Sequence, residues 1–177
     1  MTADRLMDLP ITPHDFVGQI MEPALDLLPT RMGSIEARIM LLSIALQESG
    51  LAHRWQVVDL ARPQVKGPAR GLLQFERGGG VKGVLTHPAC RDYAADVCLA
   101  RGVVAAPAQV YDALDQDDVL AVALGRLLLW TDPRTLPAAD DVLGGWNLYQ
   151  RVWRPGKPHP EKWAGNHTTA RAALGAT

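Results

Sequence analysis

Glu48 is the residue whose type and position most directly suggest chemistry in this chain. It lies in the segment from Leu46 to Gly50, at the end of an apolar stretch with helical spacing. The C-terminal end of a helix carries partial negative charge, and apolar neighbours disfavour an ionised carboxylate, so both should raise the pKa of Glu48. A raised pKa suits a general acid that works near neutral pH. The alternative is a solvated glutamate at a frayed helix end, which would do no chemistry.

Two later segments carry groups that could hold a ligand. The segment 71–75 places Gln74 among apolar residues after Gly71, where a side-chain amide could bind a ligand and the backbone could approach a sugar closely. Trp146, Asn147 and Tyr149 offer a stacking face and hydrogen-bonding groups, which suit a carbohydrate. The alternatives are a buried strand with a satisfied Gln74, and an aromatic stripe at helical spacing that faces the core.

The elements that must position these residues are predicted to be mainly helical. The fold class expected is a mainly α domain with at most a small β element near residues 55–75. The central helix is predicted over 35–49; it is apolar on nearly every side, begins after Ser34 and ends before Gly50. A first helix is expected to begin at Thr12-Pro13 and to be kinked or split by Pro23. Further helices are expected over 88–100, 107–114, 117–130, 138–153 and 161–174, with a flexible break at 78–80.

Composition limits the partners that the chain can have. With 47% hydrophobic and 21% charged residues, the chain is typical of a folded globular protein, and 177 residues fit one domain. A net charge of −1 gives no field that would attract nucleic acid or an anionic membrane, so neither is expected as a partner. The apolar runs are too short to cross a bilayer, and residues 1–16 lack a signal-peptide core, so synthesis in a cytoplasm without an export signal is expected.

Neither cysteines nor histidines indicate a cofactor or metal site. Cys90 and Cys98 are eight residues apart in a predicted helix, which corresponds to about 12 Å and is too far for a disulfide. Free, buried thiols and a reducing compartment are therefore expected. The histidines are scattered, and 78–80 lacks the Lys-Ser/Thr of a phosphate-binding loop, so we expect no metal and no cofactor.

The three motifs, in their order, resemble those of the lytic transglycosylases and goose-type lysozymes. That family carries a Glu-Ser pair, a Gly-Leu-Met-Gln-like segment and an Ala-Tyr-Asn motif, and the resemblance covers roughly residues 34–153. It implies one lysozyme-like domain over 1–177, with a helical lead-in over 1–33, a core over 34–153 and a C-terminal loop and helix over 154–177.

The resemblance also implies roles for single residues. Glu48 takes the position of the catalytic acid and base, and Ser49, Gly71, Gln74 and Asn147 take positions that orient or bind the substrate. This chain departs from the family just before the Asn, where Trp146 replaces a tyrosine that would contact the catalytic glutamate. An indole has no hydroxyl, and Tyr149, one turn later, is the candidate replacement.

The function implied is cleavage of the glycosidic bond between MurNAc and GlcNAc in peptidoglycan, by a bacteriophage endolysin or a lysin carried in the virion. The partners would be glycan strands of the cell wall and other virion proteins. A hydrolase usually needs a second carboxylate, for which Asp59 and Glu76 are the candidates, whereas a transglycosylase needs none, which favours the transglycosylase. The basic residues Arg151, Arg154, Lys157 and Lys162 are interpreted as a solvated or docking face, or as contacts to muropeptide carboxylates. The alternative functions are a non-catalytic structural virion protein with this fold and a small helical adaptor.

Overall fold

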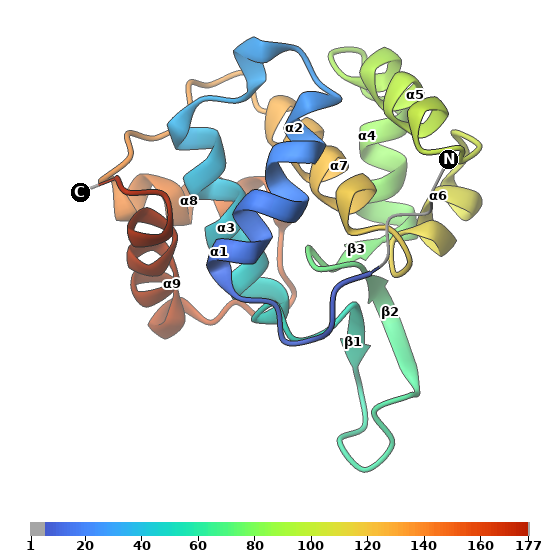
Figure 1. The fold of residues 1–177 in the computed structure, drawn as a ribbon, viewed down its shortest axis with the longest axis horizontal. Coiled ribbons are helices and arrows are strands. Elements are labelled where there is room, and N and C mark those ends of the chain that lie inside the picture. The colour runs from blue at the N-terminus through green and yellow to red at the C-terminus, as the bar shows by residue number, and fades with distance from the viewer. Residues whose placement is uncertain (1–5, 177) are drawn as a thin grey trace.

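Helix α3, Ile35–Ser49, is the element against which much of the chain packs (Figure 1). Its ends are set by the two predicted residues: Ser34 Oγ accepts a hydrogen bond from the Ala37 amide at 3.3 Å, and Gly50 adopts the left-handed conformation with φ of 59°. Most of its residues are buried, as the apolar sequence predicted. The computed structural model describes residues 6–176, and within this range the predicted mainly α fold with a small β element is confirmed.

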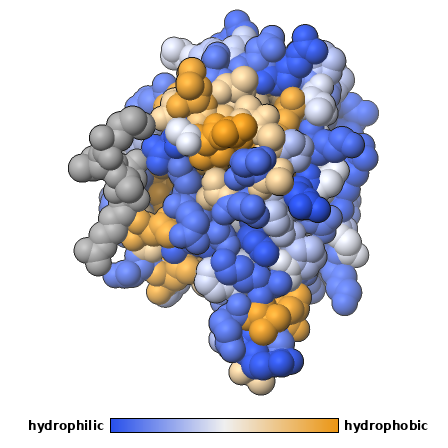
Figure 2. All heavy atoms as spheres, turned by 90° about the vertical axis from the view of Figure 1, so that its right-hand side faces the viewer, coloured by the Kyte–Doolittle hydropathy of each residue, from blue (hydrophilic) through white to orange (hydrophobic). Residues whose placement is uncertain are grey.

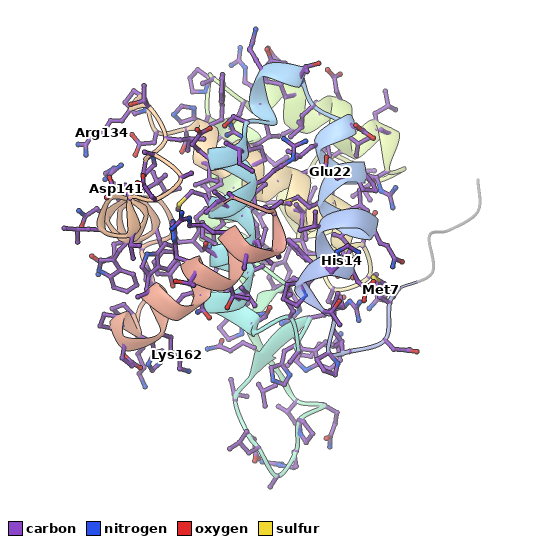
Figure 3. The ribbon with its side chains drawn as sticks, turned by 60° about the vertical axis from the view of Figure 1, so that its left-hand side comes forward. Met7, His14, Glu22, Arg134, Asp141 and Lys162 are labelled. Atoms are coloured by element: carbon purple, nitrogen blue, oxygen red, sulfur yellow. The ribbon has the colours of Figure 1, made fainter. Side chains whose placement is uncertain are left out.

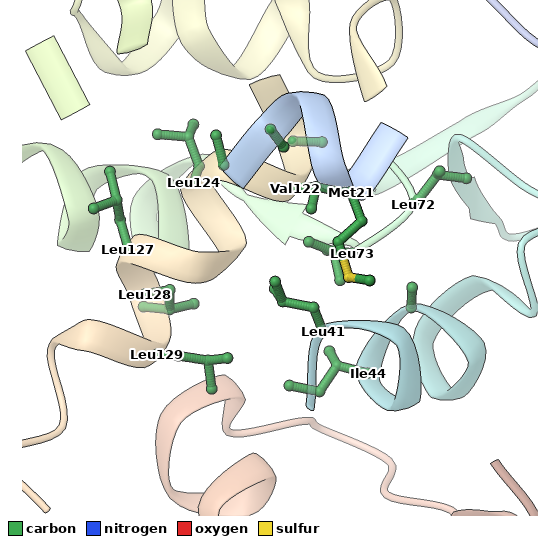
Figure 4. Packing of buried hydrophobic residues seen from close by; sticks show 14 of the residues in the cluster. Met21, Leu41, Ile44, Leu72, Leu73, Val122, Leu124, Leu127, Leu128 and Leu129 are labelled. Carbon is green, nitrogen blue, oxygen red and sulfur yellow. The ribbon is translucent and has the colours of Figure 1, made fainter. Parts of the chain in front are cut away.

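Helix α7, Asp118–Trp130, is the second buried helix. Asp117 caps it by accepting a hydrogen bond from the Leu120 amide at 2.8 Å. Leu127 and Leu128 of α7 and Leu41 of α3 belong to one hydrophobic core, which Figure 4 shows from close by. The core therefore fixes α3 and α7 relative to each other, and both helices border the site described below.

The N-terminal helix is divided, as Pro23 predicted. It consists of α1, Pro13–Asp15, a π-helical segment, Phe16–Met21, and α2, Glu22–Asp26. Thr12 caps α1 through the Asp15 amide at 3.1 Å. A proline lacks the amide hydrogen that a continuous α-helix needs, so the hydrogen-bond pattern changes just before it.

The small sheet has three antiparallel strands in the order β1-β2-β3: Trp55–Val57, Lys66–Arg70 and Phe75–Glu76. Trp55 pairs with Arg70, and Arg70 also pairs with Phe75. The loop between β1 and β2 projects from the helical body (Figures 1 and 2) and carries exposed Val58, Leu60 and Val65. The sheet thus brings β3 and the turn before it next to the helices.

The other elements follow the predictions with four corrections. The helix predicted over 88–100 is α5, Arg91–Ala100, and begins three residues later, and α4, Lys82–Thr86, is a helix that the sequence pattern does not predict. Helix α8 begins at Val142 rather than 138, because Asp141 caps it through the Gly144 amide at 2.8 Å. The expectation of a flexible break at 78–80 is wrong: Arg77–Val81 is a π-helical turn, and Gly80 lies directly against the Phe75 ring. The remaining helices are α4 Lys82–Thr86, α5 Arg91–Ala100, α6 Pro107–Ala113, α8 Val142–Trp153 and α9 Pro160–Ala173, with a 3-10 turn at Thr30–Met32.

The C-terminal helix and the two cysteines bear on the expected single domain. Helix α9 packs along α3, so the C-terminal segment belongs to the same core as the central helix. Residues 1–5 and 177 of the predicted domain lie outside the described residues. Cys90 and Cys98 are free and buried as expected, although Cys90 precedes α5 instead of lying within it. Within residues 6–176, no helix has the length and apolar character needed to cross a membrane.

Candidate active site

Glu48 lies in the last turn of α3, where the side chain of Tyr149 from α8 meets it. Tyr149 Oη donates a hydrogen bond of 2.7 Å to Glu48 Oε1. Tyr149 is only 2% exposed, and its ring stacks on that of Trp163 from α9 with centroids 5.2 Å apart. The phenol is therefore held in place by the helix packing, and it supplies the hydroxyl that Trp146 lacks.

Burial decides the protonation of this pair. Desolvation raises the pKa of Glu48 from 4.5 to about 7, and the hydrogen bond from Tyr149 opposes the shift only in part. Burial, followed by the charge of Glu48 and the hydrogen bond, raises the pKa of the Tyr149 phenol above its ordinary value. Tyr149 therefore stays protonated as a donor, while Glu48 is close to half protonated at neutral pH.

Glu48 and Tyr149 open into a groove of about 1210 Å³. It is lined by the sheet and the turns around it, and by the segments that follow α7 and α8. The residues that line the groove come from four separate regions of the sequence, 47–48, 56–87, 128–134 and 149–159. Its lining includes Gln47, Glu48, Gln74, Phe75, Glu76, Gly78, Gly79, Gly80, His87, Asp132, Arg134, Tyr149, Arg151, Trp153, Arg154, Lys157 and His159.

The groove carries more positive than negative side chains. Arg134, Arg151, Arg154 and Lys157 line it, against the acidic residues Glu48, Glu76 and Asp132. The Asp132 side chain is 4% exposed and bonded at 2.6 Å to the Arg151 guanidinium, so this charge is already compensated. With Asp132 paired and Glu48 only about half ionised, cations outnumber free carboxylates in the groove, and an anionic group of a ligand would be attracted to it.

Gln74 and Gly71 form one tight turn at the sheet end of the groove. Gln74 lines the groove with a left-handed backbone, φ 52°, and its Nε2 donates to the Gly71 carbonyl at 2.8 Å. Gly71, with φ 74°, lies behind it and is buried; a β-carbon there would come within 3.0 Å of the Leu114 carbonyl. Gly71 therefore shapes the turn, and Gln74 is the residue of this motif that reaches the groove.

Three other predicted residues lie outside the groove lining. Ser49 is buried, and its Oγ donates to the Ala45 carbonyl at 3.0 Å and accepts from the Leu51 amide at 3.2 Å. Trp146 packs against Tyr149 and Trp163, at centroid distances of 5.4 and 5.6 Å. Asn147 is exposed on α8 and does not line the groove. Its backbone carbonyl accepts a hydrogen bond of 3.2 Å from Arg151, which does line the groove. The structure thus brings together Glu48, Gln74 and Tyr149, but not Ser49, Gly71, Trp146 or Asn147.

The two candidate second carboxylates are in different places. Asp59 lies in the β1–β2 loop, pairs with Arg62 at 2.8 Å and does not line the groove. Glu76, on β3, lines the groove and is exposed. Of the two, only Glu76 could face the same ligand as Glu48.

Sequence reasoning missed several groove residues. Asp132 lies two residues after the end of the apolar helix α7, and the Asp132-Pro133 pair is a turn signal in the sequence. Trp153, at the end of α8, also lines the groove, and its Nε1 donates to the Leu73 carbonyl at 3.0 Å, which ties α8 to the Gln74 turn. Gln47 bonds the carbonyl of His159 at 3.0 Å and so holds the loop before α9 at the rim of the groove.

Within the described part of the chain, no three His, Cys, Asp or Glu side chains are grouped closely enough to hold a metal ion. Comparisons with protein-family models, with curated proteins and with solved structures found no match for this chain. Interpretation of the groove therefore depends on its own geometry.

Proposed function

We propose that this protein is a peptidoglycan-cleaving enzyme that breaks the glycosidic bond between MurNAc and GlcNAc by the lytic transglycosylase route. The observation that carries the proposal is Glu48, a carboxyl with a pKa of about 7 that lines a groove of about 1210 Å³. In this interpretation the chain has a lysozyme-like fold and acts on the cell wall, as a phage endolysin or as a lysin carried in the particle.

In the first step, protonated Glu48 gives its proton to the glycosidic oxygen as the bond from C1 of MurNAc to that oxygen breaks. The GlcNAc side leaves as an alcohol, and positive charge develops at C1 and the ring oxygen. The pKa of about 7 leaves a large fraction of Glu48 able to donate at neutral pH. Tyr149 holds Glu48 Oε1 at 2.7 Å, which leaves the other carboxyl oxygen to carry the proton.

In the second step, ionised Glu48 takes the proton from the 6-hydroxyl of the same MurNAc, whose oxygen attacks C1. The product is a 1,6-anhydro ring, no water is consumed, and Glu48 returns to its protonated form. The hydrogen bond from Tyr149 stabilises the carboxylate between the two steps, because it favours the charged form. One carboxyl therefore suffices for both proton transfers.

The charges of the groove support the same substrate class. Peptidoglycan carries carboxylates on its peptide stems, and Arg134, Arg154 and Lys157 give the groove an excess of cations. Asp132 is held by Arg151 and is poorly placed to act as a second catalytic carboxylate. Glu76 is the groove carboxylate that a hydrolase would use, so its role can be tested directly.

The test is digestion of purified peptidoglycan, followed by mass spectrometry of the products. Wild type should release products with 1,6-anhydro ends, and Glu48→Gln should lower the rate by roughly 1,000-fold because it removes the proton donor and acceptor. Glu76→Gln should retain activity under the transglycosylase route. Asp92→Asn, which alters an exposed carboxylate on α5, is the matched control and should behave as wild type.

Two outcomes would count against the proposal. Reducing ends that depend on Glu76 would replace the transglycosylase by a hydrolase. Absence of cleavage by wild type between pH 5 and 9 would favour the second candidate, a non-catalytic structural virion protein. The position of Trp146 and Asn147 outside the groove is the observation that favours this candidate.

A further inference from the structure

A second pocket, of about 710 Å³, lies at the other end of α3. It is formed where the N-terminal turn of α3 meets the C-terminal end of α7 and the loop that follows it. We call it the arginine pocket, because Arg31, Arg126 and Arg134 all line it. Arg134 lies on the loop between α7 and α8, as Figure 3 shows.

Arg126 is the unusual residue of this pocket. It is the single charged residue of the α7 interior, it is 2% exposed, and its Nη1 is buried without a hydrogen-bond partner in residues 6–176. Its Nε donates to the Met32 carbonyl at 2.6 Å, and no ion pair within the described residues includes it. A buried guanidinium without a counter-charge costs stability, and an anionic ligand would supply the missing counter-charge.

The surroundings of Arg126 add to its positive potential. The Arg126 and Arg31 guanidiniums both lie near the Trp130 ring, 5.0 and 5.8 Å from its centroid. The N-terminal end of α3, with its partial positive charge, reaches the pocket at Ser34. Burial lowers the pKa of Arg126 only to about 10, so the group is still charged at neutral pH.

Two carboxylates also line the pocket, and neither neutralises Arg126. Asp132 is bonded to Arg151 on the groove side. Glu36, in the first turn of α3, is half-buried and makes no ion pair with Arg126 within the described residues. The positive charges of the pocket are therefore available to an external anion.

We propose that the arginine pocket binds a ligand that carries a carboxylate next to an apolar group. The carboxylate would accept hydrogen bonds from Arg126 and Arg134, whose planar guanidiniums match its two oxygens. The apolar group would pack on Leu129, Trp130 and Leu136, which complete the lining. A free organic acid and the C-terminus of a peptide share this chemistry.

Binding is measured by NMR titration of the full chain, with the indole N–H of Trp130 and the Nε–H of Arg126 as reporters. N-acetylleucine is the probe, N-acetylleucinamide its uncharged control, and acetyl-alanyl-leucine the peptide probe. N-acetylleucine should shift both reporters in a saturable manner, and the amide should not. Tighter binding of acetyl-alanyl-leucine would assign the site to peptide ends, and equal or weaker binding would assign it to free acids.

Arg126→Met should weaken the affinity for N-acetylleucine about tenfold or more, since a charge-assisted hydrogen bond is lost. Arg134→Ala, at a surface position that does not threaten folding, should weaken it severalfold, and Glu36→Gln should strengthen it by removing a nearby negative charge. Arg91→Ala, on exposed α5, is the control and should leave the affinity unchanged. For the three variants that keep Arg126, the Trp130 indole and the Arg126 Nε–H both serve as reporters, and for Arg126→Met the Trp130 indole serves alone.

The proposal is overturned if the amide binds as well as the acid, if inorganic phosphate binds and N-acetylleucine does not, or if Arg126→Met binds like wild type. Its failure is separable from that of the catalytic proposal. Glu48→Gln should still bind N-acetylleucine, because Glu48 does not line this pocket.

Discussion

The two ends of α3 border two pockets, and the buried ionisable group in each pocket responds to burial in a different way. At the C-terminal end, burial moves the pKa of Glu48 from 4.5 to about 7. At the N-terminal end, burial moves the pKa of Arg126 from 12.5 to about 10. The first shift reaches neutral pH and the second does not.

The difference follows from where each group starts. Desolvation penalises the charged form of either side chain, but an ordinary carboxyl needs a shift of only a few pKa units to become neutral at pH 7. The ordinary pKa of a guanidinium lies so far above 7 that burial does not bring it to neutral pH. The guanidinium therefore stays charged, and the free energy of burying that charge lowers the stability of the fold. The same physical penalty therefore produces a group that exchanges a proton at one end of α3 and a fixed charge at the other.

The largest effect expected on stability is a pH-dependent gain from Glu48→Gln. The folded-state pKa of about 7 lies above the ordinary value of 4.5, so protonated Glu48 contributes stability that is complete below pH 4.5 and is lost as the pH rises to 7. The free energies of unfolding of wild type and Glu48→Gln should therefore be similar at pH 4.5. At pH 8 the variant should be more stable by about 3 kcal/mol.

Urea unfolding at a series of pH values measures this difference, and other titrating groups cancel between the two proteins. Asp92→Asn should show no such trend, because Asp92 is exposed. A difference between wild type and Glu48→Gln that stays constant from pH 4.5 to 8 would mean that Glu48 titrates like a solvated glutamate, and the contrast with Arg126 would disappear.

A smaller effect is expected from Tyr149→Phe, which removes the one hydrogen bond that lowers the pKa of Glu48. The midpoint of the Glu48 titration should rise by about one pH unit, which corresponds to about 1.4 kcal/mol. The titration can be followed by NMR of the Glu48 side-chain carboxyl carbon. Tyr111→Phe, on α6, removes a hydroxyl that donates a hydrogen bond to the Pro68 carbonyl on β2, and it should leave the midpoint in place. An unchanged midpoint in Tyr149→Phe would show that burial alone sets the pKa.

The sequence predicts the buried carboxyl at the C-terminal end of α3, but it does not predict the pocket around Arg126 at the N-terminal end. The bounds of α3 depend on local signals, Ser34 before an apolar run and Gly50 after it, and both acted as expected. The raised pKa of Glu48 followed from the same pattern, since the apolar run that predicts a buried helix also predicts a desolvated carboxyl at its end.

Contacts between residues far apart in the sequence determine the conformation of residues 78–80 and the neighbours of Tyr149 and Trp146, which the sequence pattern does not predict. Residues 78–80 form an ordered π-helical turn because Gly80 packs against Phe75, which no local rule indicates. Tyr149 and Trp146 share one face of α8 at helical spacing, but only the position of α3 determines that Tyr149 reaches Glu48 while Trp146 meets Trp163.

Arg126 offered a signal that went unused. It is the one basic residue in the otherwise apolar run of α7, and such a residue must either find a partner or stay unpaired in the core. The sequence could not say which, because the Met32 carbonyl and the Trp130 ring reach Arg126 only through tertiary packing.

The smallest effect is expected from Arg126→Met, and it completes the comparison between the ends of α3. The substitution loses the bond to the Met32 carbonyl and the contact with Trp130, but it also removes the cost of burying a charge. The two contributions oppose each other, so the free energy of unfolding should change by less than about 1 kcal/mol. Because Arg126 stays charged with a pKa of about 10, the change should be the same at pH 4.5 and pH 8 when measured by urea unfolding. A large loss of stability would identify Arg126 as a structural residue of the core, in which case its charge would need no ligand to explain it.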